Sequence, residues 1–290
     1  MRNLRVFFIT CAAVFVVGVA MSIGGAAAGG VQGFEKVAED RDWVTTGPGA
    51  QATVELQDLD FDAIEATGVM DVVIVGESSY SEVVRDYNLE GAAEPKAGTA
   101  VCVFGSNVEP PDVKLDGKTL KLTGGAEQEF QGINLNFSSA SVYPAVLVFC
   151  SDKEIDSIKV SSAFSDVTLK GISVKQADIQ LNYGDVETEN IVSQGIMIDN
   201  EFGDAALSGD LKGTTEIQLE EGDIELDTKA DPKAYTMKIK TQVGDITIGD
   251  KENGESKADE EGYSYTQTGG EDTLLLETIN GDVKVRQISQ

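Results

Sequence analysis

An aspartate preceded by glycine or serine recurs at a fixed interval through the second half of this 290-residue chain. The positions spaced by 19 residues are Asp166, Asp185, Asp204 and Asp223, and the same step returns at Asp245 and Asp282. A period of this length is typical of repeat architectures, in which each repeat is one supersecondary unit. Such a unit is too small to bury its own apolar face, so neighbouring units must stack to build a core.

Apolar residues hold fixed positions on both sides of each step. Equivalent positions before it are Val160, Ile179, Ile198 and Ile217, and equivalent positions after it are Val167, Val186, Ala205 and Ile224. Within each half the apolar positions alternate with a period of two, which is the period of a strand. One coil is therefore a strand, a tight turn, a second strand and a corner near Gly171, Asn190, Gly209 or Thr228. The sequence predicts an all-β fold, a parallel β-helix or β-solenoid with coils of about 19 residues.

The chain divides into four parts. Residues 1–30 form an N-terminal apolar segment, residues 31–50 a linker, residues 51–157 an irregular N-terminal β part of the solenoid, and residues 158–290 the regular repeats. The irregular part contains a hairpin signal at Asp116-Gly117, which suits a type I′ turn. Within the repeats, residues 250–272 are polar, acidic and rich in glycine, so we expect a loop there. We expect the few residues after Val285 not to cap the last coil.

No charged residue occurs between Val6 and Phe34. The segment from Val6 to Ala28 is long enough to cross a hydrocarbon layer of about 30 Å as a transmembrane helix. It also fits a signal helix, because small residues precede a cleavage point at Ala26-Ala27-Ala28. In both cases Arg2 and Arg5 stay inside and the rest is exported. We expect a single-pass cell-membrane protein with an extracytoplasmic C-terminal domain, or a secreted protein if the segment is cleaved.

Composition narrows the classes of function. The chain has 22 basic and 50 acidic residues and no histidine, which gives a net charge of −28. This charge repels nucleic acid, whose binding needs basic side chains on one face. Without histidine, Ser-His-Asp and Cys-His catalytic arrangements are excluded. Paired carboxylates could still act on glycosides, but the sparse basic residues do not favour acidic polysaccharides as substrates. We therefore expect no enzyme and no cofactor.

The glycine-aspartate steps allow two interpretations. Aspartate after glycine suits a tight turn, because its carboxylate accepts backbone hydrogen bonds. The residues assigned to such turns are Gly184, Asp185, Gly203, Asp204, Gly222, Asp223, Gly244, Asp245, Gly281 and Asp282. A column of carboxylates could instead hold calcium, which takes about six to eight oxygen ligands. The candidates for this second, weaker interpretation are Asp166, Asp185, Asp204 and Asp223.

Two further sets of residues stay open between alternatives. Phe164, Tyr183 and Phe202 are equivalent aromatic positions, which could stack on one another and seal the core or form a platform for sugar rings. Cys102 and Cys150 lie in the exported part, where they could form a disulfide or remain buried thiols in different strands.

The chain resembles the bacterial putative-adhesin family of cell-surface β-solenoid domains of unknown function, and is similar to the auto-transporter adhesin head GIN domains. The features that carry the resemblance are the apolar N-terminus, the strand at Val69–Ile74, the serial Gly-Asp-Val/Ile steps and the closing Asn280–Val285 coil. The family implies an exported parallel β-helix and brings no catalytic residues. We expect a membrane-anchored, adhesin-like interaction protein that binds a protein or a cell-wall polymer. A regulatory or sensory envelope component that acts with a membrane partner is the alternative.

Overall fold

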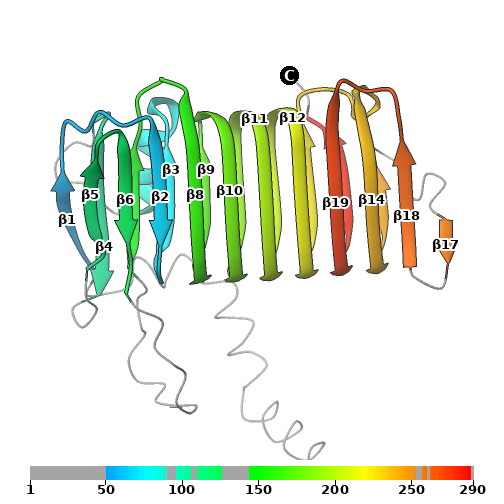
Figure 1. Cartoon of the computed structure of the whole chain (residues 1–290), viewed down its shortest axis with the longest axis horizontal. Coiled ribbons are helices and arrows are strands. Elements are labelled where there is room, and N and C mark those ends of the chain that lie inside the picture. The colour runs from blue at the N-terminus through cyan, green and yellow to red at the C-terminus, as the bar shows by residue number, and fades with distance from the viewer. Residues whose placement is uncertain are drawn as a thin grey trace, which may run out of the picture. The chain divides into compact units, whose positions relative to one another are not determined.

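In the computed structural model, strands that are 19 residues apart in the sequence lie side by side and pair in parallel (Figure 1). Ile179 of β10 (Ser173–Tyr183) pairs with Val160 of β8 (Ile155–Phe164) on one side and with Ile198 of β11 (Val186–Phe202) on the other. Ile198 in turn pairs with Ile217 of β12 (Ala205–Glu221). The predicted all-β, solenoid-like architecture and the register of its regular coils are confirmed.

The structure describes residues 50–87, 89, 96–105, 110–125, 144–249, 251–252, 257–259 and 262–288. The predicted transmembrane or signal helix at residues 1–30 lies outside the described residues, and so does nearly all of the predicted linker. Within the described part, none of the helices has the length and apolar character needed to cross a membrane.

Each regular coil contributes one strand to a front row and one to a back row. The back strands are β9 (Val167–Lys170), the first half of β11, the first half of β12 and β13 (Ile224–Thr228). The corners between the rows lie where the sequence predicted them. Gly171 and Asn190 adopt φ angles of 62° and 51°, in the left-handed region that suits glycine and asparagine.

The stacking order of the coils departs from the chain order. The C-terminal coil, β19 (Asp272–Asn280) and β20 (Val283–Gln287), lies between the coil of β12 and β13 and the coil of β14 (Tyr235–Val243) and β15 (Ile246–Ile248). In the front row, Leu276 pairs with Ile217 on one side and with Ile239 on the other. Figure 1 shows β19 between β12 and β14. The C-terminal coil therefore does not end the stack.

Residues 250–272, predicted as a loop, contain strands. β18 (Gly262–Gln267) runs antiparallel along β14, and β17 (Lys257–Asp259) runs antiparallel along β18. In the back row, β16 (Lys251–Glu252) pairs with β15. The prediction of a loop was wrong because it relied on acidity and glycine content. The backbone N–H and C=O groups along the outer edge of β14 need hydrogen-bond partners, and β18 supplies them.

The other end of the stack begins before the regular repeats. β2 (Ala63–Thr67) and β3 (Asp71–Val75) form a coil in register with β8 and β9, since Ile64 pairs with Ile158 and Val72 with Val167. The predicted hairpin is formed by β5 (Asp112–Asp116) and β6 (Thr119–Thr123), and β6 runs parallel to β2.

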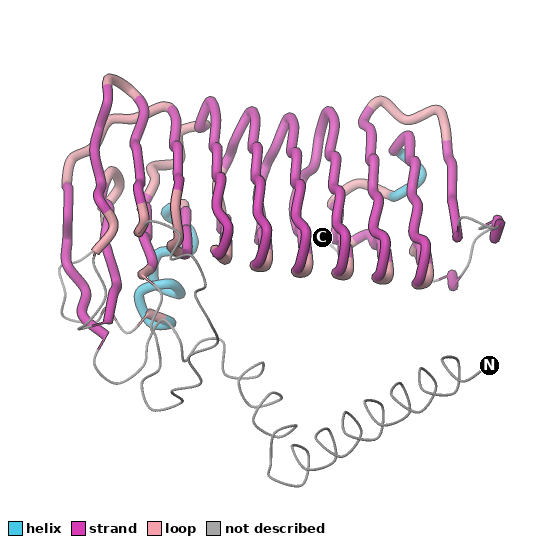
Figure 2. Tube along the Cα trace, turned by 60° about the horizontal axis from the view of Figure 1, so that its bottom comes forward, coloured by secondary structure: helices cyan, strands magenta, loops and turns pink. Residues whose placement is uncertain are grey.

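A second small core lies on the outer side of the back row at this end. β7 (Ala145–Phe149) is buried on both faces, in keeping with its continuous run of apolar residues. It pairs with β3 and with β4 (Thr99–Gly105), and β4 pairs with β1 (Ala50–Leu56). A 3-10 turn, η1 (Glu77–Ser79), leads into helix α4 (Tyr80–Asp86), and Figure 2 shows this helix at the same end of the stack. Val83 of α4 packs into the second core. A further 3-10 turn, η2 (Pro232–Ala234), precedes β14.

The main core consists of columns of aliphatic side chains that run along the stack. The clearest column comprises Leu122, Ala66, Val160, Ile179, Ile198, Ile217, Leu276 and Ile239, all of them buried. Burying a leucine or isoleucine side chain contributes about 1.5–3 kcal/mol relative to leaving it exposed. The column therefore stabilises the stacking of one coil on the next.

Candidate functional site

The turns between front and back strands are linked from coil to coil by hydrogen bonds from backbone to carboxylate. Oδ1 of Asp185 accepts the backbone N–H of Asp204 at 3.0 Å, and Oδ1 of Asp204 accepts that of Asp223 at 2.9 Å. We call the whole series the aspartate ladder. In spatial order it comprises Asp71, Asp166, Asp185, Asp204, Asp223, Asp282 and Asp245. It follows the stacking order, so Asp282 lies between Asp223 and Asp245.

The glycine before each aspartate makes the close approach between coils possible. Gly203 has a φ of 136°, and a Cβ there would lie 2.0 Å from the carbonyl oxygen of Gly184. The equivalent positions Gly184, Gly222, Gly244 and Gly281 approach the preceding carbonyl oxygen in the same way. The residues that the sequence assigned to turns thus all lie at turns, where they hold adjacent coils together.

This arrangement bears on the calcium hypothesis for Asp166, Asp185, Asp204 and Asp223. One oxygen of each carboxylate already accepts a backbone N–H from the next coil, for which a cation would compete. Within the described part of the chain, acidic and cysteine side chains form no group of three or more that could hold a metal ion. Calcium binding stays an untested hypothesis.

The equivalent aromatic residues form a stack at the ends of the front strands. The ring centroids of Phe164 and Tyr183 are 5.0 Å apart with an interplanar angle of 8°, and those of Tyr183 and Phe202 are 4.9 Å apart at 6°. Both faces of Tyr183 are therefore covered by neighbouring rings and are not open to a sugar. The side chain is still 44% exposed, so the stack borders solvent and seals the core only in part.

Cys102 and Cys150 are buried thiols in the structure and do not form a disulfide. Cys102 lies in β4, and Cys150 directly follows β7. Burial raises the pKa of the Cys150 thiol to about 12, which keeps it protonated and unreactive at neutral pH. Of the two alternatives left open by the sequence, the structure adopts the buried thiols.

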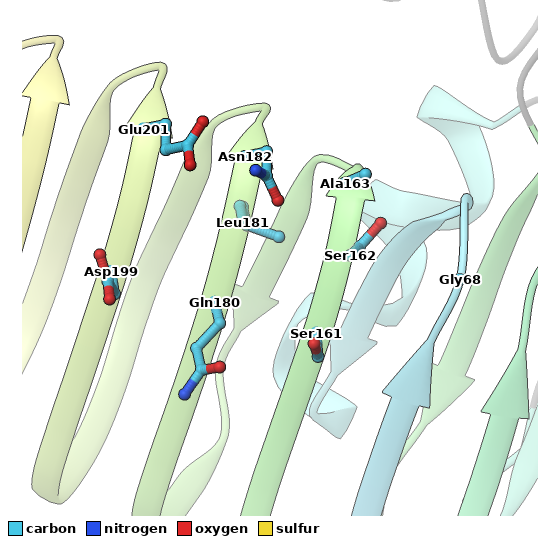
Figure 3. A pocket seen from close by; sticks show the side chains of 9 residues that line it. All are labelled: Gly68, Ser161, Ser162, Ala163, Gln180, Leu181, Asn182, Asp199 and Glu201. Atoms are coloured by element: carbon cyan, nitrogen blue, oxygen red, sulfur yellow. The ribbon is translucent and has the colours of Figure 1, made fainter. Parts of the chain in front are cut away.

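A polar depression of about 280 Å³ lies on the front face, the outward surface of the front row (Figure 3). Its lining comes from the end of β2 and from β8, β10 and β11, and comprises Gly68, Ser161, Ser162, Ala163, Gln180, Leu181, Asn182, Asp199 and Glu201. Strand length explains its position. β2 ends at Thr67, opposite Ser161, and the chain turns at Gly68 with a φ of 85°, whereas β8 continues to Phe164.

The polar groups of the depression come from corresponding positions of successive coils. Gln180 pairs with Ser161 on one side and with Asp199 on the other, so the three side chains form one outward row. Asn182 and Glu201 follow two residues later on their strands and also point outward. Together these five residues present a hydroxyl, two amides and two carboxylates to solvent, a set that offers both donors and acceptors of hydrogen bonds.

Together these features define an all-β, solenoid-like domain whose turns serve the stacking of coils and whose front face carries a polar depression. Residues 112–286 match the Toastrack DUF4097 family, and the chain belongs to this family. The match confirms the resemblance found in the sequence.

Solved structures with a distant likeness include a putative cell adhesion protein from Clostridium sporogenes, at 16% identity and a TM-score of 0.45, covering 83% of this chain and 100% of that one. Another is a putative adhesin from Bacteroides fragilis, at 10% identity and a TM-score of 0.38, covering 84% of this chain and 99% of that one. No curated protein matches the chain.

The sequence did not point to the depression. Its residues occupy outward positions of the repeat, which the pattern of apolar ladders leaves unconstrained. The one available signal was the 19-residue spacing of Ser161, Gln180 and Asp199, which places three polar side chains in one row. The boundary of the depression depends on Gly68, a residue far from the regular repeats in the sequence.

Proposed function

We propose that this protein is a non-enzymatic, extracytoplasmic interaction protein, adhesin-like in that it presents a solenoid surface to a partner at the cell surface. The segment from Val6 to Ala28 tethers it to the membrane, or directs its secretion if the segment is cleaved. The partner is a protein or a cell-wall polymer.

One observation carries the proposal, a difference between the inward-facing and outward-facing residues of the same strands. From coil to coil the inward residues keep one chemical character, whereas the outward residues change theirs. The inward column of Val160, Ile179, Ile198, Ile217, Leu276 and Ile239 is aliphatic throughout. The outward column one residue earlier is Lys159, Asp178, Met197, Glu216, Leu275 and Lys238. The fold thus constrains the interior and leaves the front face free for recognition, as in other solenoids.

The chemistry of the turns supports binding rather than catalysis. The most regular carboxylates of the chain, those of the aspartate ladder, accept backbone hydrogen bonds and hold the coils together. The polar groups that remain free for a partner lie on the outward faces. With a net charge of −28, the surface favours cationic or neutral partners and disfavours acidic polymers.

The proposal is tested on intact cells by adding a protease and following the domain, together with mass spectrometry of the mature N-terminus. We expect the domain to be digested from outside, with an N-terminus that either retains Val6–Ala28 or begins after it. A domain that is protected in intact cells and digested only after lysis contradicts the proposal. Crosslinking of a retained N-terminal segment to a membrane protein would favour the regulatory or sensory alternative.

A further inference from the structure

We propose that the depression on the front face is a binding site for a non-acidic glycan, with a preference for sugars that carry amino groups. This inference rests on the proposed function, because it names the class of ligand that the exposed solenoid recognises. It is carried by the polar groups that line the depression, by its two carboxylates, which form no ion pair within the described part of the chain, and by the position of these groups across successive coils.

The hydrogen-bonding groups match sugar hydroxyls better than they match basic side chains. The amides of Gln180 and Asn182 both donate and accept hydrogen bonds, and so does the hydroxyl of Ser161. A sugar hydroxyl also donates and accepts, so it can satisfy either function. Lysine and arginine side chains only donate, so they can bind the oxygen atoms of these amides but not their N–H groups.

The two carboxylates set the charge preference. Among the residues that the structure describes, Asp199 and Glu201 form no ion pair. Elsewhere on the front row, Glu277 pairs with Lys240 at 3.4 Å and Asp156 pairs with Lys175. Unpaired carboxylates accept hydrogen bonds from hydroxyls, attract an ammonium group and repel uronic acids.

The open lining of the depression can admit a chain of sugars. Small residues of the first strands, Gly68, Ser161 and Ala163, lie next to longer side chains on β10 and β11 (Figure 3). The side chains of Gln180, Asn182, Asp199 and Glu201 are exposed, so the depression opens to solvent rather than enclosing its ligand. The site does not depend on aromatic stacking, because neighbouring rings cover both faces of Tyr183.

The test uses the purified full chain in detergent and three hexasaccharides: fully deacetylated chitohexaose, N-acetylated chitohexaose and hexagalacturonate. Binding is measured by calorimetry for the wild type and for the site variant Asp199→Asn/Glu201→Gln. The matched control is Glu187→Gln/Glu189→Gln, which removes the same charge from the back-row part of the same strand, β11. A second site variant, Gln180→Val/Asn182→Val, removes the amides while keeping residues that favour strands.

We expect the deacetylated hexamer to bind most tightly, the acetylated hexamer more weakly and the acidic hexamer least. The charge variant should lose about tenfold or more in affinity for the deacetylated hexamer, because hydrogen bonds to charged groups are the stronger ones. The amide variant should weaken both chitohexaoses, and the back-row control should bind like the wild type.

The inference is overturned if neither chitohexaose binds, if the acidic hexamer binds as tightly as the others, or if the control loses as much affinity as the site variant. These failures are separate from that of the proposed function. An exported protein that binds no chitohexaose leaves the proposed function standing, whereas a protein protected inside intact cells contradicts it whatever the calorimetry gives.

Discussion

Oδ1 of Asp223 accepts the backbone N–H of Asp282 at 2.7 Å, although the two residues are 59 positions apart in the sequence. The next residue of the ladder is Asp245, whose N–H donates to Oδ1 of Asp282 at 2.9 Å. The C-terminal coil is therefore inserted between two coils that precede it in the chain. Both neighbours depend on it, since it pairs with β12 on one side and with β14 on the other.

The close packing of the turns predicts that Gly203→Ala is strongly destabilising. The new Cβ would lie 2.0 Å from the carbonyl oxygen of Gly184, at a φ of 136° that alanine rarely adopts. We expect a loss of at least about 2 kcal/mol in the free energy of unfolding, measured by chemical denaturation. Gly125→Ala is the control, because a Cβ there meets nothing within 4 Å. Equal stability of the two variants would refute the role of the turn glycines.

The aspartate ladder predicts different effects for two substitutions of Asp204. Asp204→Ala removes the acceptor of the Asp223 N–H and should cost about 1–2 kcal/mol. Asp204→Asn keeps a side-chain oxygen in place and should cost less. Thermal unfolding of both variants measures the difference. If asparagine is as disruptive as alanine, the carboxylate does more than accept this hydrogen bond.

The aromatic stack predicts that Tyr183 contributes through its ring rather than its hydroxyl. Tyr183→Ala loses stacking contacts with both Phe164 and Phe202 and should destabilise the fold by about 1–3 kcal/mol. Tyr183→Phe keeps both contacts and should stay close to the wild type. Denaturation curves compare the two variants, and a similar loss for both would point to the hydroxyl instead.

The ion pair between β8 and β10 predicts a pH effect. A hydrogen bond from Lys175 and its positive charge lower the pKa of Asp156 below its ordinary value. A folded-state pKa below the unfolded one stabilises the fold above the unfolded pKa, and this contribution is lost as pH falls through the folded pKa. The group is fully exposed, so we expect a small effect on stability.

The variant that tests this is Lys175→Gln, in which the pKa of Asp156 should rise towards its ordinary value. Carboxyl chemical shifts of ¹³C-labelled aspartate, followed during a pH titration by NMR, report the change. An Asp156 pKa that does not move in the variant would show that Lys175 is not the cause.

The register of the coils could be predicted from the sequence because it depends on local periodicity. Val160, Ile179 and Ile198 recur at one spacing, and each pairs with the next. The order of the last coils could not be predicted in this way. Ile239 of β14 and Leu276 of β19 are interchangeable as neighbours of Ile217 in the aliphatic column, so either strand could follow β12.

The candidate site could not be predicted from the sequence for a related reason. The depression exists because β2 ends at Thr67 while its neighbour β8 continues, and this pairing joins residues 94 positions apart, as from Ala63 to Ser157. The turn residues were easier to predict, because glycine followed by aspartate favours a tight turn by itself. Their role as links between coils emerged only when the coils were stacked.

The order of the coils is tested most directly by disulfide crosslinking in the front row. Gln218 pairs with Glu277, and Glu277 pairs with Lys240, so Gln218 and Lys240 lie two strands apart. Adjacent strands are about 4.8 Å apart, within the Cα separation that a disulfide spans, whereas a separation of two strands is about 10 Å and exceeds it.

We expect Gln218→Cys/Glu277→Cys to form a disulfide under mild oxidation, identified by mass spectrometry of the linked peptides, and Gln218→Cys/Lys240→Cys to remain reduced. A disulfide in the second variant and none in the first would mean that the coils stack in chain order, and would contradict the inserted C-terminal coil.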